Sequence, residues 1–111
     1  MIYVAHEPHP NSRLDTSLLD GEDWQPVFSA SYSPTFSPKD AIAEARKALA
    51  DFDPARDEIA WVGGDPLSIG IACTVATEIC KAKGAPAYVW LKYERPKGDL
   101  PHRYVPVMVP A

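Results

Sequence analysis

The sequence has few cysteines and no concentration of positive charge, and each shortage excludes a class of function. Its two cysteines, Cys73 and Cys80, lie seven residues apart in an expected helix, which separates their Cα atoms by about 10 Å. That distance is too long for a disulfide, so we expect two buried thiols and no sign of an oxidising compartment. The net charge is −4 and no lysine or arginine cluster offsets it. This argues against nonspecific nucleic-acid binding, which needs positive charge to meet phosphate.

The sequence also lacks a membrane span and a secretion signal. Its longest apolar stretch follows Leu67, is interrupted by Thr74, Thr77 and Glu78, and is shorter than the roughly 20 residues that a membrane helix needs. A signal peptide carries basic residues before its apolar region, and the apolar segment 2–5 has none before it. We therefore expect a cytoplasmic protein without a membrane partner.

No catalytic or cofactor motif is present. The patterns GxxxxGK[ST], GxGxxG and GxSxG do not occur, and both cysteines lie inside an expected apolar helix, which favours core packing over a reactive thiol. A zinc site is one candidate, because two histidines and a carboxylate lie close together at His6, Glu7 and His9, with His102 elsewhere. The spacing is not that of HExxH, and the prolines at 8 and 10 prevent a helix, so a surface loop is favoured. We predict no catalytic residue, no metal site and no cofactor.

The clearest positive signal is the segment 58–84. The run 59–62 is typical of a strand buried on both faces. After two glycines, Asp65 is a good N-cap and Pro66 suits the first helical position. The helix that follows is apolar almost all round, which predicts a buried helix, and Gly84 is a suitable residue to end it.

The rest of the chain completes an α/β domain around this segment. Ser37 is expected to cap a helix over 38–52, and Pro106 marks the last strand as an edge. The other expected elements are strands at 2–5, 26–30, 87–93 and 103–109, and a helical turn at 16–19. We predict a single domain over 1–111 in the order ββαβαββ. It has two main helices and a mixed sheet of about five strands, with right-handed parallel crossovers and a C-terminal antiparallel hairpin.

One ligand-binding crevice is predicted at the carboxyl ends of the inner strands. In open α/β sheets ligands bind beyond these ends, where the loops after two strands should meet. The residues are Ser31, Tyr32, Ser33, Gly63, Gly64 and Asp65. The alternative is that the glycines and the capping aspartate only make a tight turn, and a carboxylate there would repel a phosphate.

A second candidate is the aromatic side of the strand 87–93. Tyr88, Trp90 and Lys92 share one face, and Tyr104 stands on the neighbouring strand. Two interpretations stay open: a protein-binding surface, since tyrosine and tryptophan are enriched at interfaces, or the face beneath a helix.

The segments GGDPLSIGIA, VWLKYERP and RYVPV carry a resemblance. They resemble small uncharacterised bacteriophage-encoded α/β proteins, in which a strand, a Gly-Asp-Pro turn and an apolar helix precede a C-terminal hairpin. The resemblance covers about the last half of the chain. It implies an α/β fold and a phage or mobile-element origin, and it implies no activity.

Two functional hypotheses follow. The first is a small soluble binding or regulatory protein that contacts another protein and is able to form a homo-oligomer through an edge strand. The second is a nucleotide- or phosphorylated-metabolite-binding protein, or an enzyme, that uses the crevice from Gly63 to Asp65. The lack of catalytic motifs favours the first.

Overall fold

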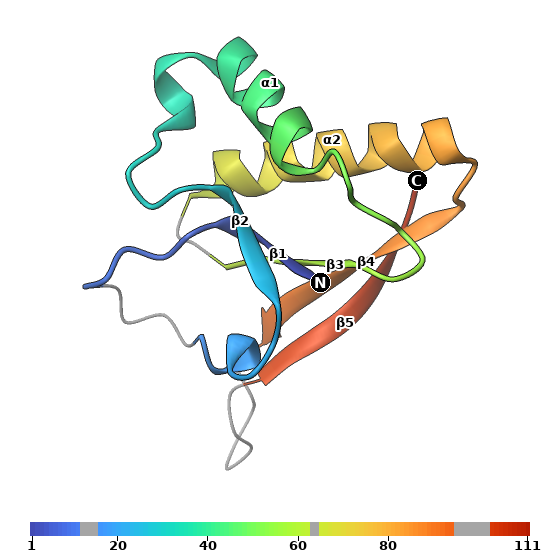
Figure 1. Cartoon of the computed structure of the whole chain (residues 1–111), viewed down its shortest axis with the longest axis horizontal. Helices are drawn as coiled ribbons and strands as arrows, with labels where there is room; N and C mark the ends of the chain where they lie inside the picture. Colours follow the sequence, from blue (N-terminus) through green and yellow to red (C-terminus); the bar gives the residue numbers. More distant parts are fainter. Residues whose placement is uncertain (12–15, 63–64, 95–102) are drawn as a thin grey trace.

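The computed structural model describes residues 1–11, 16–62, 65–94 and 103–111, which form one α/β unit (Figure 1). The predicted glycines 63 and 64 lie outside the described residues. The elements are β1 (Ile2–His6), η1 (Ser17–Leu19), β2 (Trp24–Phe28), η2 (Pro34–Phe36), α1 (Pro38–Ala48), β3 (Glu58–Ala60), α2 (Pro66–Lys83), β4 (Ala87–Glu94) and β5 (Arg103–Pro110). The predicted fold class and element order are confirmed.

The sheet is mixed, with strand order β2-β1-β3-β4-β5. The first four strands are parallel, and β5 pairs antiparallel to β4 at one edge. Both helices lie on the same face of the sheet (Figure 1). The crossovers from β2 to β3 and from β3 to β4 advance in the same direction across the sheet. Because parallel crossovers have one hand, both helices must then lie on the same face.

The connection from β1 to β2 runs in the other direction and covers the opposite face. Leu18 and Leu19 of η1 belong to a separate apolar cluster on that face. The other members of this cluster are Ile2, Val4, Ala60, Val62, Leu91 and Tyr104. The sheet is therefore covered by helices on one face and by a short 3₁₀ turn on part of the other.

Helix α2 forms as its sequence predicts. The Leu67 N–H donates to the Asp65 carboxylate (Oδ1) at 3.0 Å, Pro66 takes the first turn, and Gly84 ends the helix at φ 69°. That left-handed backbone conformation favours glycine. The fully buried Ala72, Val75, Ala76 and Cys80 pack on the sheet. Helix α2 contributes more buried side chains to the main core than α1 does. None of the described helices is long and apolar enough to cross a membrane.

Helix α1 is shorter than predicted. Ser37 caps it, since the Asp40 N–H donates to the Ser37 hydroxyl at 3.4 Å. The helix ends at Ala48 instead of continuing to Phe52, because Leu49 leaves the helical region at φ −98°, ψ 15°. The unwound turn places Leu49 and Phe52 fully in the core, so burial of two large side chains outweighs one more helical turn.

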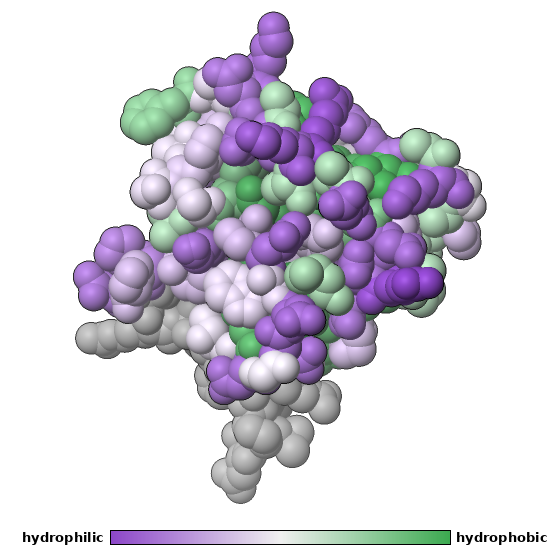
Figure 2. All heavy atoms as spheres, viewed as in Figure 1, coloured by the Kyte–Doolittle hydropathy of each residue, from purple (hydrophilic) through white to green (hydrophobic). Residues whose placement is uncertain are grey.

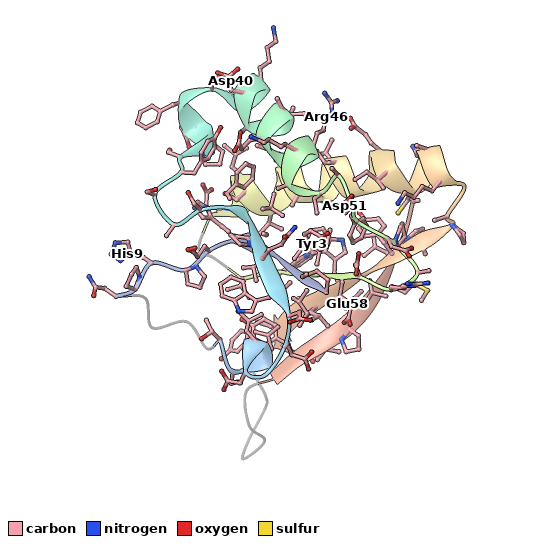
Figure 3. All side chains as sticks on the ribbon, in the orientation of Figure 1. Tyr3, His9, Asp40, Arg46, Asp51 and Glu58 are labelled. Atoms are coloured by element: carbon pink, nitrogen blue, oxygen red, sulfur yellow. The ribbon has the colours of Figure 1, made fainter. Side chains whose placement is uncertain are left out.

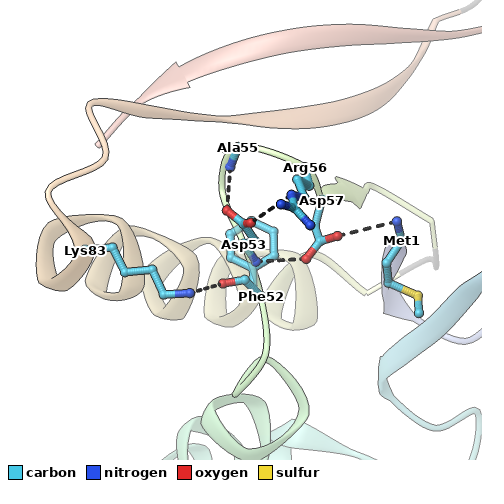
Figure 4. A network of polar contacts seen from close by, with 7 residues as sticks. All are labelled: Met1, Phe52, Asp53, Ala55, Arg56, Asp57 and Lys83. Atoms are coloured by element: carbon cyan, nitrogen blue, oxygen red, sulfur yellow. Dashed lines mark hydrogen bonds and ion pairs between the residues drawn. The ribbon is translucent and has the colours of Figure 1, made fainter.

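The turn between α1 and β3 is held by polar contacts at the amino ends of the strands (Figure 4). The Asp53 N–H donates to the Asp57 carboxylate at 2.8 Å, and the Met1 ammonium lies 3.4 Å from the same carboxylate. The Lys83 ammonium donates to the Phe52 carbonyl at 2.8 Å and ties the end of α2 to this turn. These contacts occupy the end of the sheet opposite the predicted crevice.

The strand bounds differ from the predicted ones by one or two residues, and the differences at β2 and β3 have a physical reason. β2 begins at Trp24, before Pro26, because the Ile2 N–H donates to the Asp23 carbonyl and starts the ladder there. Alternation then turns the backbone of Pro26 away from β1, where its missing N–H costs no ladder bond. β3 ends at Ala60, and after it the pairing with β1 becomes irregular, with the His6 N–H donating to Val62.

Candidate functional site

The carboxyl ends of β1 and β2 bring the His6 ring close to the aromatic pair Phe28 and Tyr32. The rings of Phe28 and Tyr32 stack with centroids 5.2 Å apart, and His6 tilts against Phe28 at 6.1 Å. Tyr32 is fixed by a turn in which its N–H donates to the Ser29 carbonyl. The loop after β2 therefore folds back over Phe28, the ring that His6 contacts from β1.

A line of polar side chains continues from His6 to the start of α2. His6 Nδ1 lies 2.7 Å from the Ser68 hydroxyl, and that hydroxyl lies 3.4 Å from Asp65 Oδ2. Ser68 is completely buried, whereas His6 and Asp65 are half-buried. The two carboxylate oxygens of Asp65 thus make different contacts: Oδ1 caps α2, and Oδ2 faces Ser68.

Two of the predicted site residues, Tyr32 and Asp65, lie at the same end of the sheet. They are linked through Phe28, His6 and Ser68 and do not touch directly. The predicted Ser31 and Ser33 are exposed, and Gly63 and Gly64 lie outside the described residues.

The sequence raises His6 only as a zinc candidate, and it does not indicate Ser68 at all. They lie 62 positions apart, so no spacing could reveal their contact. A polar residue at the end of a predicted strand and a serine on an otherwise apolar helix were the available signals.

The two described histidines do not converge on a metal site. His9 lies at the outer end of the segment that follows β1, away from the sheet (Figure 3). Its Nδ1 accepts from the Asn11 N–H at 3.2 Å. Within the described ranges, no group of three or more histidine, cysteine or acidic side chains could hold a metal ion.

A groove of about 530 Å³ lies between β2 and α1, at the edge of the sheet that β2 forms. Its walls include Tyr32 and the charged Glu44, Lys47 and Asp51. On the side of the molecule that carries β2, hydrophilic side chains cover most of the surface (Figure 2). Gln25 also lines the groove, and its side-chain amide donates to the Ala48 carbonyl at 3.2 Å.

Beneath α2, the helix-facing side of β4 is closed. Trp90 is fully buried and Tyr88 is 1 % exposed, so of the two interpretations of this aromatic side, the face under a helix is correct. The Tyr88 hydroxyl is bonded to Thr77 at 2.9 Å and to the Cys73 thiol at 3.1 Å. Burial, helped by the Cys73 contact, raises the pKa of Tyr88 above its ordinary value. Tyr104 lies on the other face, against Tyr93.

The opposite side of β4 and β5 is apolar, and the described residues cover it only in part. Alternation turns one set of side chains away from the helices, and antiparallel partners share a face. We call this set the outer hairpin face: Ala87, Val89, Leu91, Tyr93, Tyr104, Pro106, Met108 and Pro110. η1 covers the Leu91–Tyr104 end, while Met108 is 71 % exposed and Pro106 and Pro110 are exposed.

Comparison with known proteins adds no family to this geometry: no family model, curated protein or solved structure matches the chain. The resemblance to bacteriophage-encoded proteins therefore stays a prediction.

Proposed function

We propose that this protein is a protein-binding module that contacts its partner through the outer hairpin face. One observation carries the proposal. None of the eight side chains of this face is charged, although charged residues make up 23% of the chain. Uncharged, contiguous and exposed apolar surface of this kind marks interaction sites, and methionine and tyrosine are enriched in them. Met108 at its centre has the flexible side chain of adaptable binding surfaces.

The border of the face indicates the chemistry of the partner. Glu58 pairs with Val89 in the register and shares its face. The segment after η1 adds the exposed Asp20, Glu22 and Asp23. An apolar partner surface with a basic border fits this acidic border and the net charge of −4. A second copy fits less well, because two such faces would bring carboxylates against carboxylates.

The partner contacts the face of the hairpin and does not extend its edge. The Trp61 N–H donates to the Leu91 carbonyl at 2.9 Å, so the backbone of Leu91 points to β3. Alternation along both strands then points the backbone of positions 104, 106, 108 and 110 outward from β5. Prolines occupy two of these four positions and remove their N–H donors, which is a common protection of an edge strand. The predicted homo-oligomer through an edge strand loses support for the same reason.

Affinity capture with three versions of the protein tests the proposal. Met108→Glu places a charge on the outer hairpin face, and Val107→Glu places the same charge on the adjacent residue of β5, whose side chain is 40% exposed on the helix side. Partners that wild type and Val107→Glu retain, and that Met108→Glu loses, are identified by mass spectrometry. Binding of the purified partner is then measured by calorimetry, where we expect Met108→Glu to weaken affinity at least tenfold.

Both variants must keep the wild-type melting temperature for the comparison to count. A partner that binds wild type and Met108→Glu with equal affinity would refute this use of the face. A wild-type protein that self-associates in sedimentation, with Met108→Glu monomeric, would assign the face to a second copy instead.

A further inference from the structure

A cavity of about 450 Å³ lies beside the start of β2, on the face of the sheet that η1 covers. This volume falls in the range of about 300–1,000 Å³ that is usual for small-molecule sites. The walls come from the segment after β1, from η1 and the turn after it, and from β2, and they include Glu7, Pro8, His9, Leu19, Asp20 and Trp24. Residues 12–15 lie outside the described part of the chain, and no part of the site is assigned to them.

Two carboxylates face this cavity from a backbone that hydrogen bonds hold in place. The Glu7 N–H donates to the Phe28 carbonyl at 2.9 Å, and the Asp20 N–H donates to the Ser17 carbonyl at 3.1 Å. The side chains of Glu7 and Asp20 themselves form no hydrogen bond or ion pair with the residues that the structure describes. Both carboxylates are therefore available to a ligand.

The cavity combines this negative charge with an accessible aromatic ring. Glu7 is half-buried and Asp20 is exposed, and no described lysine or arginine lines the cavity with them. The Trp24 side chain is 39% exposed, and the indole ring is the aromatic group that attracts cations most strongly. A guanidinium group matches all three side chains, because its plane stacks on an aromatic ring and its N–H groups donate to carboxylates in pairs. An anion would be repelled by both carboxylates.

We propose that this cavity binds a guanidinium group, with Trp24 stacking on its plane and with Glu7 and Asp20 accepting from its N–H groups. A free guanidinium compound and an arginine side chain of a protein share this chemistry. The site does not depend on the outer hairpin face. Met108→Glu, which tests that face, should leave guanidinium binding unchanged, so failure of one proposal is distinguishable from failure of the other.

Butylguanidinium and butylurea form a matched pair of probes. Both have the same alkyl chain and a planar N–H head, and only butylguanidinium is charged. The indole N–H signal of Trp24 in proton–nitrogen NMR spectra reports binding, and a Trp24→Phe variant assigns it among the three tryptophans. We expect butylguanidinium to shift the Trp24 signal and to leave the signal of the fully buried Trp90 in place. An equal response to butylurea, or no response to butylguanidinium, would overturn the proposal.

Glu7→Gln and Asp20→Asn test the carboxylates with the fold preserved, since each removes a charge at nearly constant shape and breaks no hydrogen bond among the described residues. Each should weaken butylguanidinium binding about fivefold. Glu22→Gln is the matched control, because Glu22 is an exposed acid near Asp20 that does not line the cavity. It should weaken binding less than about twofold. An equal loss in all three variants would assign the binding to general negative charge and overturn the site.

N-acetylarginine amide, which has no charged group besides its guanidinium, distinguishes the two sources of the ligand. Binding at least as tight as that of butylguanidinium supports an arginine side chain of a protein as the occupant. Binding of butylguanidinium without binding of the capped arginine supports a free small molecule. Absence of binding by both compounds would overturn the proposal.

Discussion

The two faces of the β4–β5 hairpin have similar sequences and opposite environments. On the helix side, Trp90 and Tyr88 are buried beneath α2, with the Tyr88 hydroxyl satisfied by Thr77 and Cys73. On the outer hairpin face, Val89 and Met108 are equally apolar, yet Met108 is 71% exposed. A strand that is apolar on both faces is typical of a sheet covered on both sides. Here, among the described residues, α1 and α2 cover one face and η1 covers only the Leu91–Tyr104 end of the other, so Met108 stays exposed.

This comparison separates folding from binding. Side chains under α2 should determine stability and leave partner binding unaffected once stability is corrected for. Side chains of the outer hairpin face should do the reverse.

The largest effect is expected at Trp90. Trp90→Ala removes a fully buried indole and leaves a cavity, which should cost about 3–5 kcal/mol in the free energy of unfolding. Met108→Ala should change it by less than about 0.5 kcal/mol, as is usual for exposed positions. Chemical denaturation measures both values. Equal losses would mean that the outer hairpin face is packed in the folded protein.

A smaller effect is expected at the Tyr88 hydroxyl. Tyr88→Phe leaves Thr77 and Cys73 without this partner and should cost about 1–2 kcal/mol. The raised pKa of Tyr88 also predicts a pH dependence. The unfolded chain ionises near the ordinary tyrosine value of about 10 while the folded chain stays protonated, so stability is complete below that pH and falls as pH rises above it.

Unfolding experiments between neutral and alkaline pH separate the two contributions. The difference between wild type and Tyr88→Phe should narrow as the pH rises. Burial and the nearby Asp57 and Asp51 also raise the pKa of Tyr3. Its ionisation therefore causes the same loss of stability at high pH in both proteins. A constant difference across the range would contradict the role of burial at Tyr88.

The cap of α2 comes next. Asp65→Ala removes the bond from the Leu67 N–H and should lower stability by about 1 kcal/mol. Asp65→Asn should lower it much less, because asparagine caps almost as well. Thermal denaturation of wild type and the two variants gives their order of stability. If Asp65→Asn is as unstable as Asp65→Ala, the charge of Asp65, and not its capping bond, stabilises the helix.

The smallest expected effect is at the ion pair between α1 and α2. Arg46 and Glu78 form two hydrogen bonds, at 3.0 and 3.1 Å, on the exposed surface. The Arg46 hydrogen bonds lower the pKa of Glu78, so any contribution is present at neutral pH and is lost as pH falls through that lowered value. Exposed pairs are screened by solvent, and Arg46→Gln should leave the melting temperature almost unchanged at neutral pH.

Local signals in the sequence were sufficient for most of the fold. Asp65, Pro66 and Gly84 each act through their own backbone, so the limits of α2 could be predicted from residue type alone. Ser37 began α1 for the same reason. The end of α1 could not be predicted, because it depends on Leu49 and Phe52 reaching a core that the rest of the chain builds.

The candidate sites depended on contacts that sequence does not contain. Tyr32 and Asp65 were expected at one end of the sheet, where they lie, yet the side chains between them, His6 and Ser68, meet only after β1 and β3 become neighbours. The outer hairpin face was missed for a different reason. Alternation shows that Val89 and Met108 share a face, and it cannot show which face the helices cover.

Site-specific photocrosslinking tests whether the outer hairpin face contacts another protein. A benzophenone side chain is introduced at Met108 in one protein and at Val107, the adjacent residue on the opposite face, in another. We expect a crosslink from position 108 to a partner with an apolar surface and basic border, and at most a weak crosslink from position 107. Equal crosslinking from both positions, or crosslinking from 107 alone, would contradict it.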